Sequence, residues 1–359
     1  FGINNDGYYT KHNQIEINNN GNILVNDFVK ATSGNKPFYY NTGIYQASAP
    51  YTKTPGIVRN SGEVKVNLTE EQSAELKNKY EETNGNMYLN IHGIRLHEHS
   101  EGYNTGDIIV NSYKGVGVAL TAGDISVNEI DEFKNRYGYF ENSGNIEVTG
   151  EATKGIQIKN STQARLEGKN TTEGKVIASG KNTIGVELSG VNTNFENAGI
   201  IEASDYGIFQ NGYEFTNQVG TMNISTTGGK IIVNDDGDSI ATGIYLAAYK
   251  NFNENSIGQS GTLINNGNIE VNSDGEGAYN TSITGIRIHE NVTGSNNGTI
   301  LVNANGASGI AVTGGATFAG EDITNYTTFT NNGNVKVNGD KNIGLYVRHD
   351  AFNINGGNT

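Results

Sequence analysis

The side chains of this sequence that are best suited to catalysis are two neighbouring carboxylates and a serine that follows them. Asp235 and Asp236 could act as an acid and a base on a polysaccharide, because glycoside-cleaving enzymes commonly use two carboxylates. Ser239 could act as a nucleophile within Gly237-Asp238-Ser239, but Ile240 stands where the second glycine of such a motif belongs. Because this segment directly follows a repeated strand pattern, we interpret it as an acidic corner of the fold.

Two other fragments, His92-Gly93 and Arg287-Ile288-His289, resemble parts of polygalacturonase motifs. They occur in the wrong order and many repeats apart, roughly 25–30 Å at the spacing of stacked strands. Catalysis requires such groups within a few ångströms of one bond. We therefore expect no enzyme, no catalytic residue and no cofactor, and we keep a polysaccharide-acting enzyme as the least favoured alternative.

Metal binding has two weak candidates in the sequence. His97 and His99 alternate along one segment, with Glu101 as a third possible zinc ligand, but we favour an exposed turn rich in histidine as the explanation. Four acidic residues at equivalent corners of consecutive repeats could hold calcium: Asp236, Asp238, Asp274 and Glu276. A solvated acidic edge explains the second group without any ion, so we expect no metal site.

One column of side chains is suited to recognition. It occupies the third position of a repeated Gly-aliphatic-x-aliphatic strand pattern, where the side chain points outward. The column reads Tyr45, Arg95, Gly117, Gln157, Glu187, Phe209, Tyr245, Arg287, Ala311 and Tyr346. Outward aromatic side chains are not needed for a core, and aromatics beside an arginine suit sugar rings or protein hot spots. An aromatic ladder that stabilises the sheet is the alternative.

A duplication adds two histidines to this column. Residues 93–98 read Gly-Ile-Arg-Leu-His-Glu and residues 285–290 read Gly-Ile-Arg-Ile-His-Glu. Duplication of a block of repeats explains this similarity, and so do two cationic patches for a multivalent partner. The expected ligand-binding residues are Tyr45, Arg95, His97, Phe209, Tyr245, Arg287 and His289.

A sequence repeat must position these side chains. The pattern Gly-x-Ile/Val-x-Val/Ala occurs ten times, starting at Gly21, Gly62, Gly106, Gly144, Gly174, Gly199, Gly229, Gly267, Gly298 and Gly333. Each copy precedes one copy of the Gly-aliphatic-x-aliphatic pattern, and in six units an aliphatic residue or Phe stands four residues before the first glycine. Alternation with period two indicates short strands. The sequence therefore predicts an all-β fold, a right-handed parallel β-helix with three short strands per coil and about ten coils.

Asparagine marks the corners of the expected coils. It stands two residues before the first glycine in eight units, and Thr172 and Thr227 hold this place in the other two. Stacked coils would bring equivalent amides about 4.8 Å apart, within reach of hydrogen bonds along the column. We interpret these residues as structural ladders.

The chain is expected to be one β-helix segment, residues 1–359, of a larger protein, with three insertions. Residues 27–56 contain all three prolines and several tyrosines and are expected to form a loop around the Gly43 strand. Residues 68–82 are predicted to form a helix, capped by Thr69 with Gln72 three residues later. Residues 129–139 are predicted to form a short excursion. Such insertions are also candidate recognition elements.

Composition narrows the possible partners. The chain holds 24 Lys and Arg against 38 Asp and Glu, a net charge of −14, so it should repel nucleic-acid phosphates. Only 35% of residues are hydrophobic and 49 are glycine, which favours a repetitive fold with a narrow core over large globular domains.

The repeat resembles the passenger repeats of type V autotransporters. Residues 264–272 and 330–338 both read x-Asn-Asn-Gly-Asn-Ile/Val-x-Val-Asn, similar to repeats of the large fusobacterial adhesins. The resemblance implies a cell-surface or secreted bacterial protein, attached to the membrane only through a C-terminal β-barrel that this chain lacks. We expect a non-enzymatic adhesin segment that binds a glycan or protein receptor on a host or neighbouring cell. A passive stalk that presents a distal binding domain is the alternative.

Overall fold

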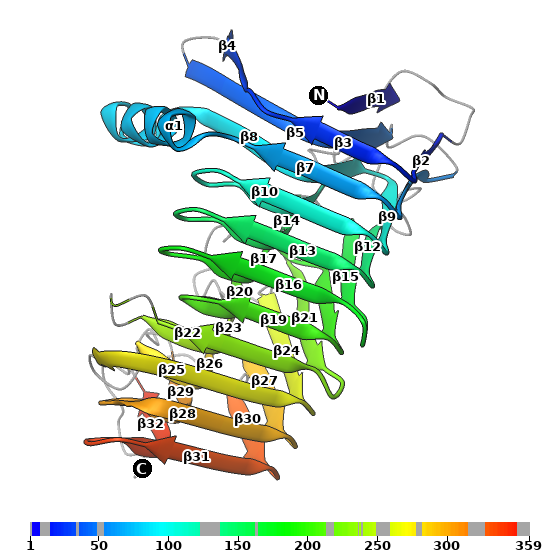
Figure 1. The fold of residues 1–359 in the computed structure, drawn as a ribbon. Helices are drawn as coiled ribbons and strands as arrows, with labels where there is room; N and C mark the ends of the chain where they lie inside the picture. The colour runs from blue at the N-terminus through cyan, green and yellow to red at the C-terminus, as the bar shows by residue number, and fades with distance from the viewer. Residues whose placement is uncertain are drawn as a thin grey trace.

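The computed structural model shows a right-handed parallel β-helix whose coils stack from β1 to β32 (Figure 1). It describes residues 2–7, 15–33, 36–48, 54–122, 137–161, 164–212, 219–235, 237, 240–248, 259–277, 282–314 and 327–349. Three sheets run along the whole stack, and sheets B and C each contain ten strands. The predicted fold class is therefore confirmed.

The three sheets alternate along the chain in the order A, B, C, and within each sheet the coils pair in parallel. Sheet A pairs, in order, β1 (Ile3–Gly7), β5 (Lys36–Ser48), β8 (Tyr88–Glu98), β11 (Val116–Ala122), β14 (Lys154–Asn160), β17 (Ile184–Ser189), β20 (Tyr206–Asn211), β23 (Ala241–Ala248), β26 (Ile283–Glu290), β29 (Ser308–Gly314) and β32 (Ile343–His349). Sheet B pairs β2 (Glu16–Asn19), β6 (Gly56–Asn60), β9 (Ser100–Asn104), β12 (Tyr137–Asn142), β15 (Arg165–Asn170), β18 (Thr193–Asn197), β21 (Gly220–Thr226), β24 (Gln259–Asn265), β27 (Val292–Asn296) and β30 (Thr328–Asn331). Sheet C pairs β3 (Asn22–Val25), β7 (Glu63–Asn67), β10 (Asp107–Asn111), β13 (Asn145–Thr149), β16 (Lys175–Ser179), β19 (Ile200–Ala203), β22 (Lys230–Asn234), β25 (Asn268–Glu276), β28 (Thr299–Asn305) and β31 (Asn334–Asn338).

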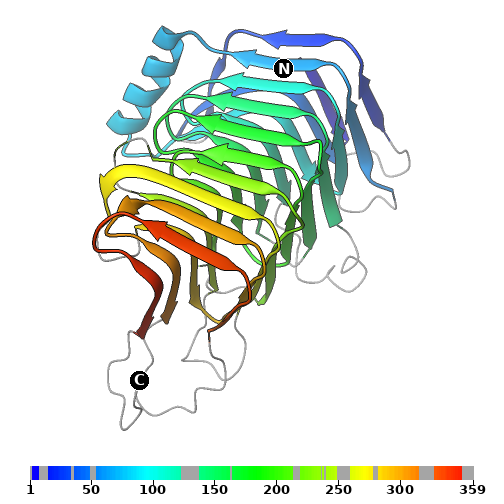
Figure 2. The same cartoon turned by 60° about the horizontal axis from the view of Figure 1, so that its bottom comes forward.

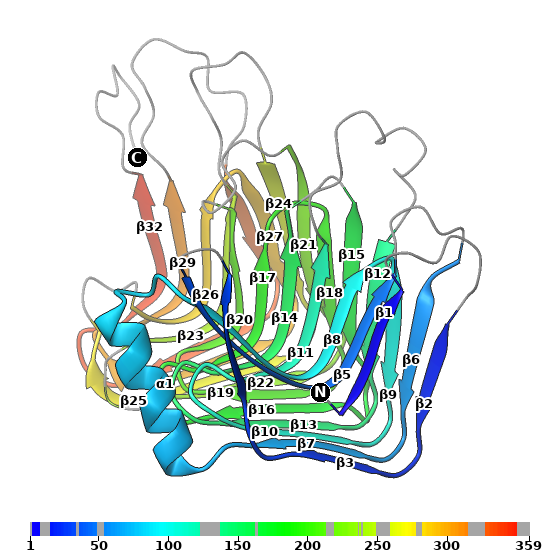
Figure 3. The same cartoon turned by 90° about the horizontal axis from the view of Figure 1, so that it is seen from above.

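Sequence alternation decides which side of each strand faces the core. In β10, Ile108 and Val110 are fully buried while Ile109 between them points outward. The register places Ile108 between Val64 and Ile146 of the neighbouring coils, so aliphatic rows run along the inside of sheet C. Seen along the stack, the three sheets enclose this core (Figure 3). Each coil is stabilised by the rows of the next, because no coil can bury its own side chains alone.

From β9 to β18, the inward row of sheet B alternates glycine and phenylalanine. Phe140 and Phe195 are the largest fully buried side chains, and Gly168 lies between them in register. A Cβ on Gly168 would lie 2.8 Å from Phe195 Cδ2 and 2.6 Å from Ile158 Cδ1. Glycine therefore provides the space that the phenylalanine rings fill. The inward glycines of sheet B, where an aliphatic residue or Phe was expected, are thus part of the core packing.

A buried amide ladder closes the turn from sheet B to sheet C. Each side-chain amide donates to the carbonyl oxygen of the next coil at 2.7–2.9 Å, in the series Asn19, Asn60, Asn104, Asn142, Asn170 and Asn197. The second part joins Thr226, Asn265, Asn296 and Asn331. A separate ladder of more exposed residues, among them Asn272 and Asn303, follows the strands of sheet C.

The ladders confirm the structural interpretation of the asparagines but correct two of its members. Asn170 and Thr226 occupy the positions predicted for Thr172 and Thr227. The turn that follows β15 is longer than its equivalents, which shifts the ladder residue away from the glycine.

Helix α1 (Glu70–Glu82) confirms the predicted helix, including its capping box. The Thr69 hydroxyl accepts from the Gln72 amide, and the Gln72 side chain accepts from the Thr69 amide. Leu76 is fully buried against the stack, whereas Ala74 is exposed. The helix lies along one flank of the first coils (Figures 1 and 3).

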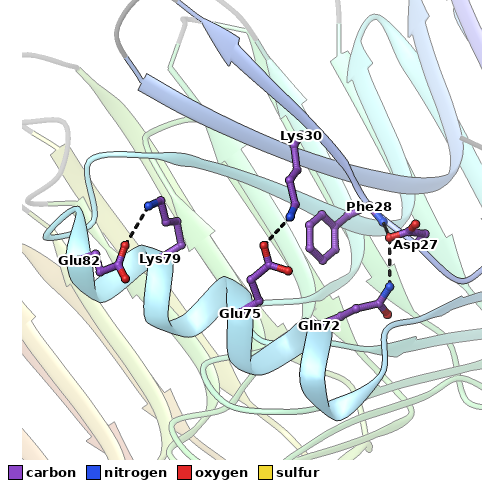
Figure 4. Close-up of polar contacts among 7 residues, drawn as sticks. All are labelled: Asp27, Phe28, Lys30, Gln72, Glu75, Lys79 and Glu82. Atoms are coloured by element: carbon purple, nitrogen blue, oxygen red, sulfur yellow. Dashed lines mark hydrogen bonds and ion pairs between the residues drawn. The ribbon is translucent and has the colours of Figure 1, made fainter.

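Polar contacts at both sides of α1 join it to different coils. Glu75 pairs with Lys30 at 2.5 Å and Gln72 donates to Asp27 at 3.0 Å (Figure 4). On the other side, Lys77 pairs with Glu151 at 2.6 Å, in the turn after β13. A cavity of about 320 Å³ remains there, lined mainly by apolar atoms of residues such as Leu68, Ala74 and Tyr113. Through these contacts, α1 connects the first coils to one another.

The insertion at 27–56 differs from expectation, and the one at 129–139 is described only at its end. Most of the predicted loop at 27–56 is strand, because β4 (Val29–Ser33) pairs antiparallel with the first half of β5 to form a hairpin. Within the predicted excursion at 129–139, residues 137–139 belong to β12, a regular strand of sheet B, and residues 129–136 lie outside the described part. Within the described ranges, no helix is long and apolar enough to cross a membrane.

Candidate functional site

The outer face of sheet A is shaped by a glycine in each strand. In β20, Gly207 and Ile208 both point inward, since a Cβ on Gly207 would lie 2.2 Å from the core atom Ile231 Cγ2 and Ile208 is fully buried. Two consecutive inward positions break the strand alternation. As a result, the residues on either side, Tyr206 and Phe209, share the outer face, with ring centroids 4.7 Å apart.

The strand register confirms the predicted outward column with one correction. The column runs through Tyr45, Arg95, Gln157, Glu187, Phe209, Tyr245, Arg287, Ala311 and Tyr346, but Ala119 and not Gly117 pairs with Arg95. Gly117 is instead the inward glycine of its strand, where a Cβ would lie 2.4 Å from Ile146 Cγ2. Gly115 and Gly117 both precede a valine, so the repeat pattern can begin at either glycine, and the sequence analysis used the first.

Three rings and an arginine form an aromatic cluster on β20, β23 and β26. Phe209 and Tyr245 stack with centroids 5.1 Å apart and an interplanar angle of 15°. Tyr206 lies 6.3 Å from Tyr245, and the guanidinium of Arg287 lies 5.2 Å from the centroid of the Tyr245 ring. Burial raises the pKa of the Tyr245 phenol, and Arg287 opposes that shift. The cluster therefore presents neutral rings beside a cation.

A second cation–aromatic pair lies on β5 and β8. The guanidinium of Arg95 is 5.5 Å from the centroid of the Tyr45 ring. The buried Nε atom of Arg95 has no hydrogen-bond partner among the described residues, and burial lowers the pKa of Arg95. The neighbouring His92 is buried, and burial, together with Arg95, holds its pKa well below the usual value.

The two predicted histidines have matching partners that the sequence did not reveal. His97 Nδ1 lies 2.8 Å from Thr121 Oγ1, and its Nε2 lies 3.1 Å from Glu98 Oε1. His289 lies 2.7 Å from Thr313 Oγ1 and 3.7 Å from Glu290 Oε1. The two threonines each follow their histidine by 24 residues, and this equal offset was the available sequence signal.

The structure thus brings the predicted binding residues into two groups on one face. Tyr45, Arg95 and His97 form the first, and Phe209, Tyr245, Arg287 and His289 form the second. Sequence reasoning also missed Tyr206, which precedes the inward glycine of β20 and shares the outer face with Phe209.

The weaker catalytic and metal candidates gain no support. Asp236, Asp238 and Ser239 lie outside the described residues, while Asp235 accepts hydrogen bonds from the Gly237 amide and the Ser273 hydroxyl. Glu276 pairs with Lys341 at 2.6 Å and Asp274 is exposed. Within the described part of the chain, no three His, Asp or Glu side chains are arranged to hold a metal ion. His92 and Arg287 lie on β8 and β26, six strands apart in sheet A.

The chain matches no protein-family model, and comparison with curated proteins and with solved structures also gives no match. The functional argument therefore depends on the chemistry of the outer face of sheet A.

Proposed function

We propose that this chain is a non-enzymatic binding segment of a secreted or surface-displayed bacterial adhesin, and that it recognises glycans with the outer face of sheet A. The observation that carries the proposal is the aromatic cluster of Tyr206, Phe209 and Tyr245 beside Arg287. Its rings lie on the face opposite the core, so packing of the β-helix does not require them.

Sugar rings present apolar C–H faces and a rim of hydroxyl groups. Flat aromatic rings match the first, and a guanidinium with several donors matches the second. The cluster is half-buried, and its rings are already held by one another, so little side-chain entropy is lost when a ligand binds. These properties favour recognition over the passive stalk. A stalk would not require any particular outward side chain on a given coil.

The surface location is part of the same proposal. The Asn-rich repeat resembles autotransporter passengers, and the confirmed parallel β-helix agrees with that resemblance. The binding partner would accordingly lie on a host or neighbouring cell. The resemblance gives no reason to prefer an enzyme activity to adhesion.

Binding of the whole chain to a panel of surface glycans tests the proposal, with Phe209→Ala/Tyr245→Ala as the test variant. Loss of two hot-spot rings should weaken binding by at least about 30-fold. Tyr103→Ala/Tyr139→Ala is the matched control, because these rings also point outward, 5.7 Å apart, but on sheet B. Binding that is equal in both variants would contradict the proposed face, and a folded chain that binds no glycan would favour the stalk.

A further inference from the structure

One outward row of sheet C alternates aliphatic and charged side chains through all ten strands of the sheet. It is the middle outward row, and the strand register aligns its members from β3 to β31. In order, the row reads Leu24, Lys65, Ile109, Glu147, Ile177, Glu202, Ile232, Glu270, Leu301 and Lys336. Leu or Ile therefore occurs on every second coil, with Lys or Glu on the coils between.

The outward rows of the other two sheets show no such alternation. The middle outward row of sheet B contains a single aliphatic residue, Ile264. On sheet A the outward residues vary, but one set of six returns after six coils. The set is Tyr45, Ala47, Arg95, His97, Ala119 and Thr121, and it returns as Tyr245, Ala247, Arg287, His289, Ala311 and Thr313. The alternation is thus a property of sheet C and not of the coil repeat.

The aliphatic residues of this row do not belong to the core. Each lies between two inward residues of its strand, as Ile109 lies between the buried Ile108 and Val110. Leu24 is 59% exposed, and the other four are half-buried. Helix α1 lies at the flank of sheet C, and no described helix or strand lies over the outer face of the sheet (Figures 1 and 3). The row is open to a partner.

The spacing of the row matches that of a second β-helix. Its aliphatic residues recur every two coils, about 9.6 Å apart. An α-helix repeats about every 5.4 Å and the side chains on one face of an extended strand about every 6.7 Å, so neither would stay in register with the row. Another stack of coils has the same spacing and can repeat each contact along the whole face.

We propose that the outer face of sheet C is the contact between two copies of this chain, which lie antiparallel about a two-fold axis at Ile177. The axis runs along the strands, so each coil lies opposite the coil at the same distance on the other side of Ile177. Ile109 then lies opposite Ile232 of the second copy, and Leu24 lies opposite Leu301. Aliphatic residues therefore meet aliphatic residues. The inference does not depend on glycan recognition.

The charges of the two copies are complementary in this arrangement. Lys230 and Glu270 of one copy pair with each other at 2.9 Å. They lie opposite Asp107 and Lys65 of the other copy, respectively, by the same coil count. Four side chains of alternating sign come together, and the two-fold axis creates this group twice. Such complementarity fixes the register of two surfaces.

One like-charge contact remains near the axis, where Glu147 lies opposite Glu202 of the second copy. Lys175, in the neighbouring outward row, lies on the coil between them, and its symmetry equivalent does the same. The two ammonium groups reduce the repulsion. An axis one coil further on, at Glu202, would be less favourable, because it would place Lys65 opposite Lys336.

The face is large enough for a specific dimer. Nine coils overlap, and strands of about five residues give a contact of roughly 43 by 17 Å on each copy. Two such faces bury about 1,500 Å², and specific complexes usually bury about 1,200–2,000 Å². The outer face of sheet A lies on another side of each coil, so a dimer would present two aromatic clusters and could bind a ligand with two epitopes.

Sedimentation velocity of the whole chain over a range of concentrations tests the inference. The unsubstituted chain should form dimers. Ile177→Asp places two carboxylates against each other on the axis and should weaken dimerisation at least about 100-fold. Ile264→Asp is the matched control, because Ile264 is also outward and is 39% exposed, but on sheet B. It should dimerise as the unsubstituted chain does, and circular dichroism should show the same fold for both variants.

Charge reversal tests the antiparallel arrangement and does not depend on the Ile177 variant. Lys65→Glu and Glu270→Lys should each weaken self-association about 10-fold, since each places like charges opposite one another. A mixture of the two variants should form mixed dimers more readily than either variant forms its own. In the mixed dimer, the new carboxylate of one chain lies opposite the new ammonium group of the other. High salt should reduce the difference.

Three results would overturn the inference: a chain that stays monomeric at millimolar concentration, equal dimerisation of the Ile177→Asp and Ile264→Asp variants, or a mixture that associates no better than its components. Oligomers that persist in Ile177→Asp would place self-association on another face. Loss of glycan binding with intact dimers would contradict the proposed function and leave this inference standing.

Discussion

The buried asparagine ladder and the outer face of sheet A run along the same coils but differ in how their residues vary from coil to coil. Along the ladder almost every coil repeats one residue, and from Asn60 to Asn170 each side-chain amide is bonded to its equivalents in the coils on both sides. On the outer face the residue changes from coil to coil, and one set of six side chains returns only after six coils. A uniform row stabilises the stack, whereas a varied row that recurs as a set points to recognition.

The largest effect is expected from the ladder. Asn142 accepts from Asn104 at 2.8 Å and donates to Asn170 at 2.9 Å in a fully buried site. Asn142→Leu should lower the free energy of unfolding by about 3 kcal/mol, because it leaves two buried polar groups without partners. Urea unfolding measures this loss, while glycan affinity of the folded chain should not change.

The more exposed ladder provides the control. Asn303 also bonds to two neighbours, Asn272 and Asn338, but it is only half-buried. Water can replace its partners, so Asn303→Leu should cost about 1 kcal/mol or less. Equal costs for the two substitutions would show that the buried ladder is not the stabilising row.

The next effect concerns the glycines that accommodate aromatic rings. Gly168→Ala would place a Cβ 2.6 Å from Ile158 Cδ1, so overpacking should lower the free energy of unfolding by about 1–3 kcal/mol. A Cβ on Gly21 would have no atom within 4 Å, so Gly21→Ala should change the free energy of unfolding by less than about 0.5 kcal/mol. Thermal unfolding of the two variants measures this difference. Equal unfolding midpoints for Gly168→Ala and Gly21→Ala would contradict the described packing.

A smaller effect is expected at the helix. Thr69→Ala removes the capping box and should cost about 1 kcal/mol of helix stability, seen as faster amide exchange in α1. Glycan binding should be unchanged. Weaker binding would mean that α1 contributes to recognition, and the insertions would then have to be added to the binding surface.

The smallest effect at neutral pH is expected at His92, and it should grow on acidification. Burial, with Arg95 nearby, holds the pKa of folded His92 well below its usual value. The unfolded chain therefore binds the extra proton first, and stability should fall as the pH drops below about 6.5. His92→Thr installs the residue that β26 has at the equivalent position, Thr284, and it should remove this part of the acid sensitivity. Identical pH profiles for both proteins would contradict the assignment.

The fold was predictable from the sequence because alternation and glycine spacing survive in every coil. The residues that were misplaced, Gly117, Thr172 and Thr227, lie where a second glycine pattern or a longer turn shifts the local count. Spacing along the chain then no longer gives the register between coils.

The outer face of sheet A was predictable only in part. The outward column needs nothing beyond strand alternation, so Tyr45, Arg95, Phe209, Tyr245 and Arg287 were found. Thr121, Thr313 and Tyr206 were not, because their place depends on cross-strand register and on the inward glycine of each strand. These are properties of stacked coils and not of a single repeat.

The most direct test of the central claim is hydrogen exchange of the whole chain with and without a bound glycan. Binding to the outer face of sheet A should slow exchange in β20, β23 and β26, the strands of the aromatic cluster. Slowing confined to the β4–β5 hairpin and α1, with the strands from β20 to β26 unchanged, would contradict the account and place recognition on the insertions.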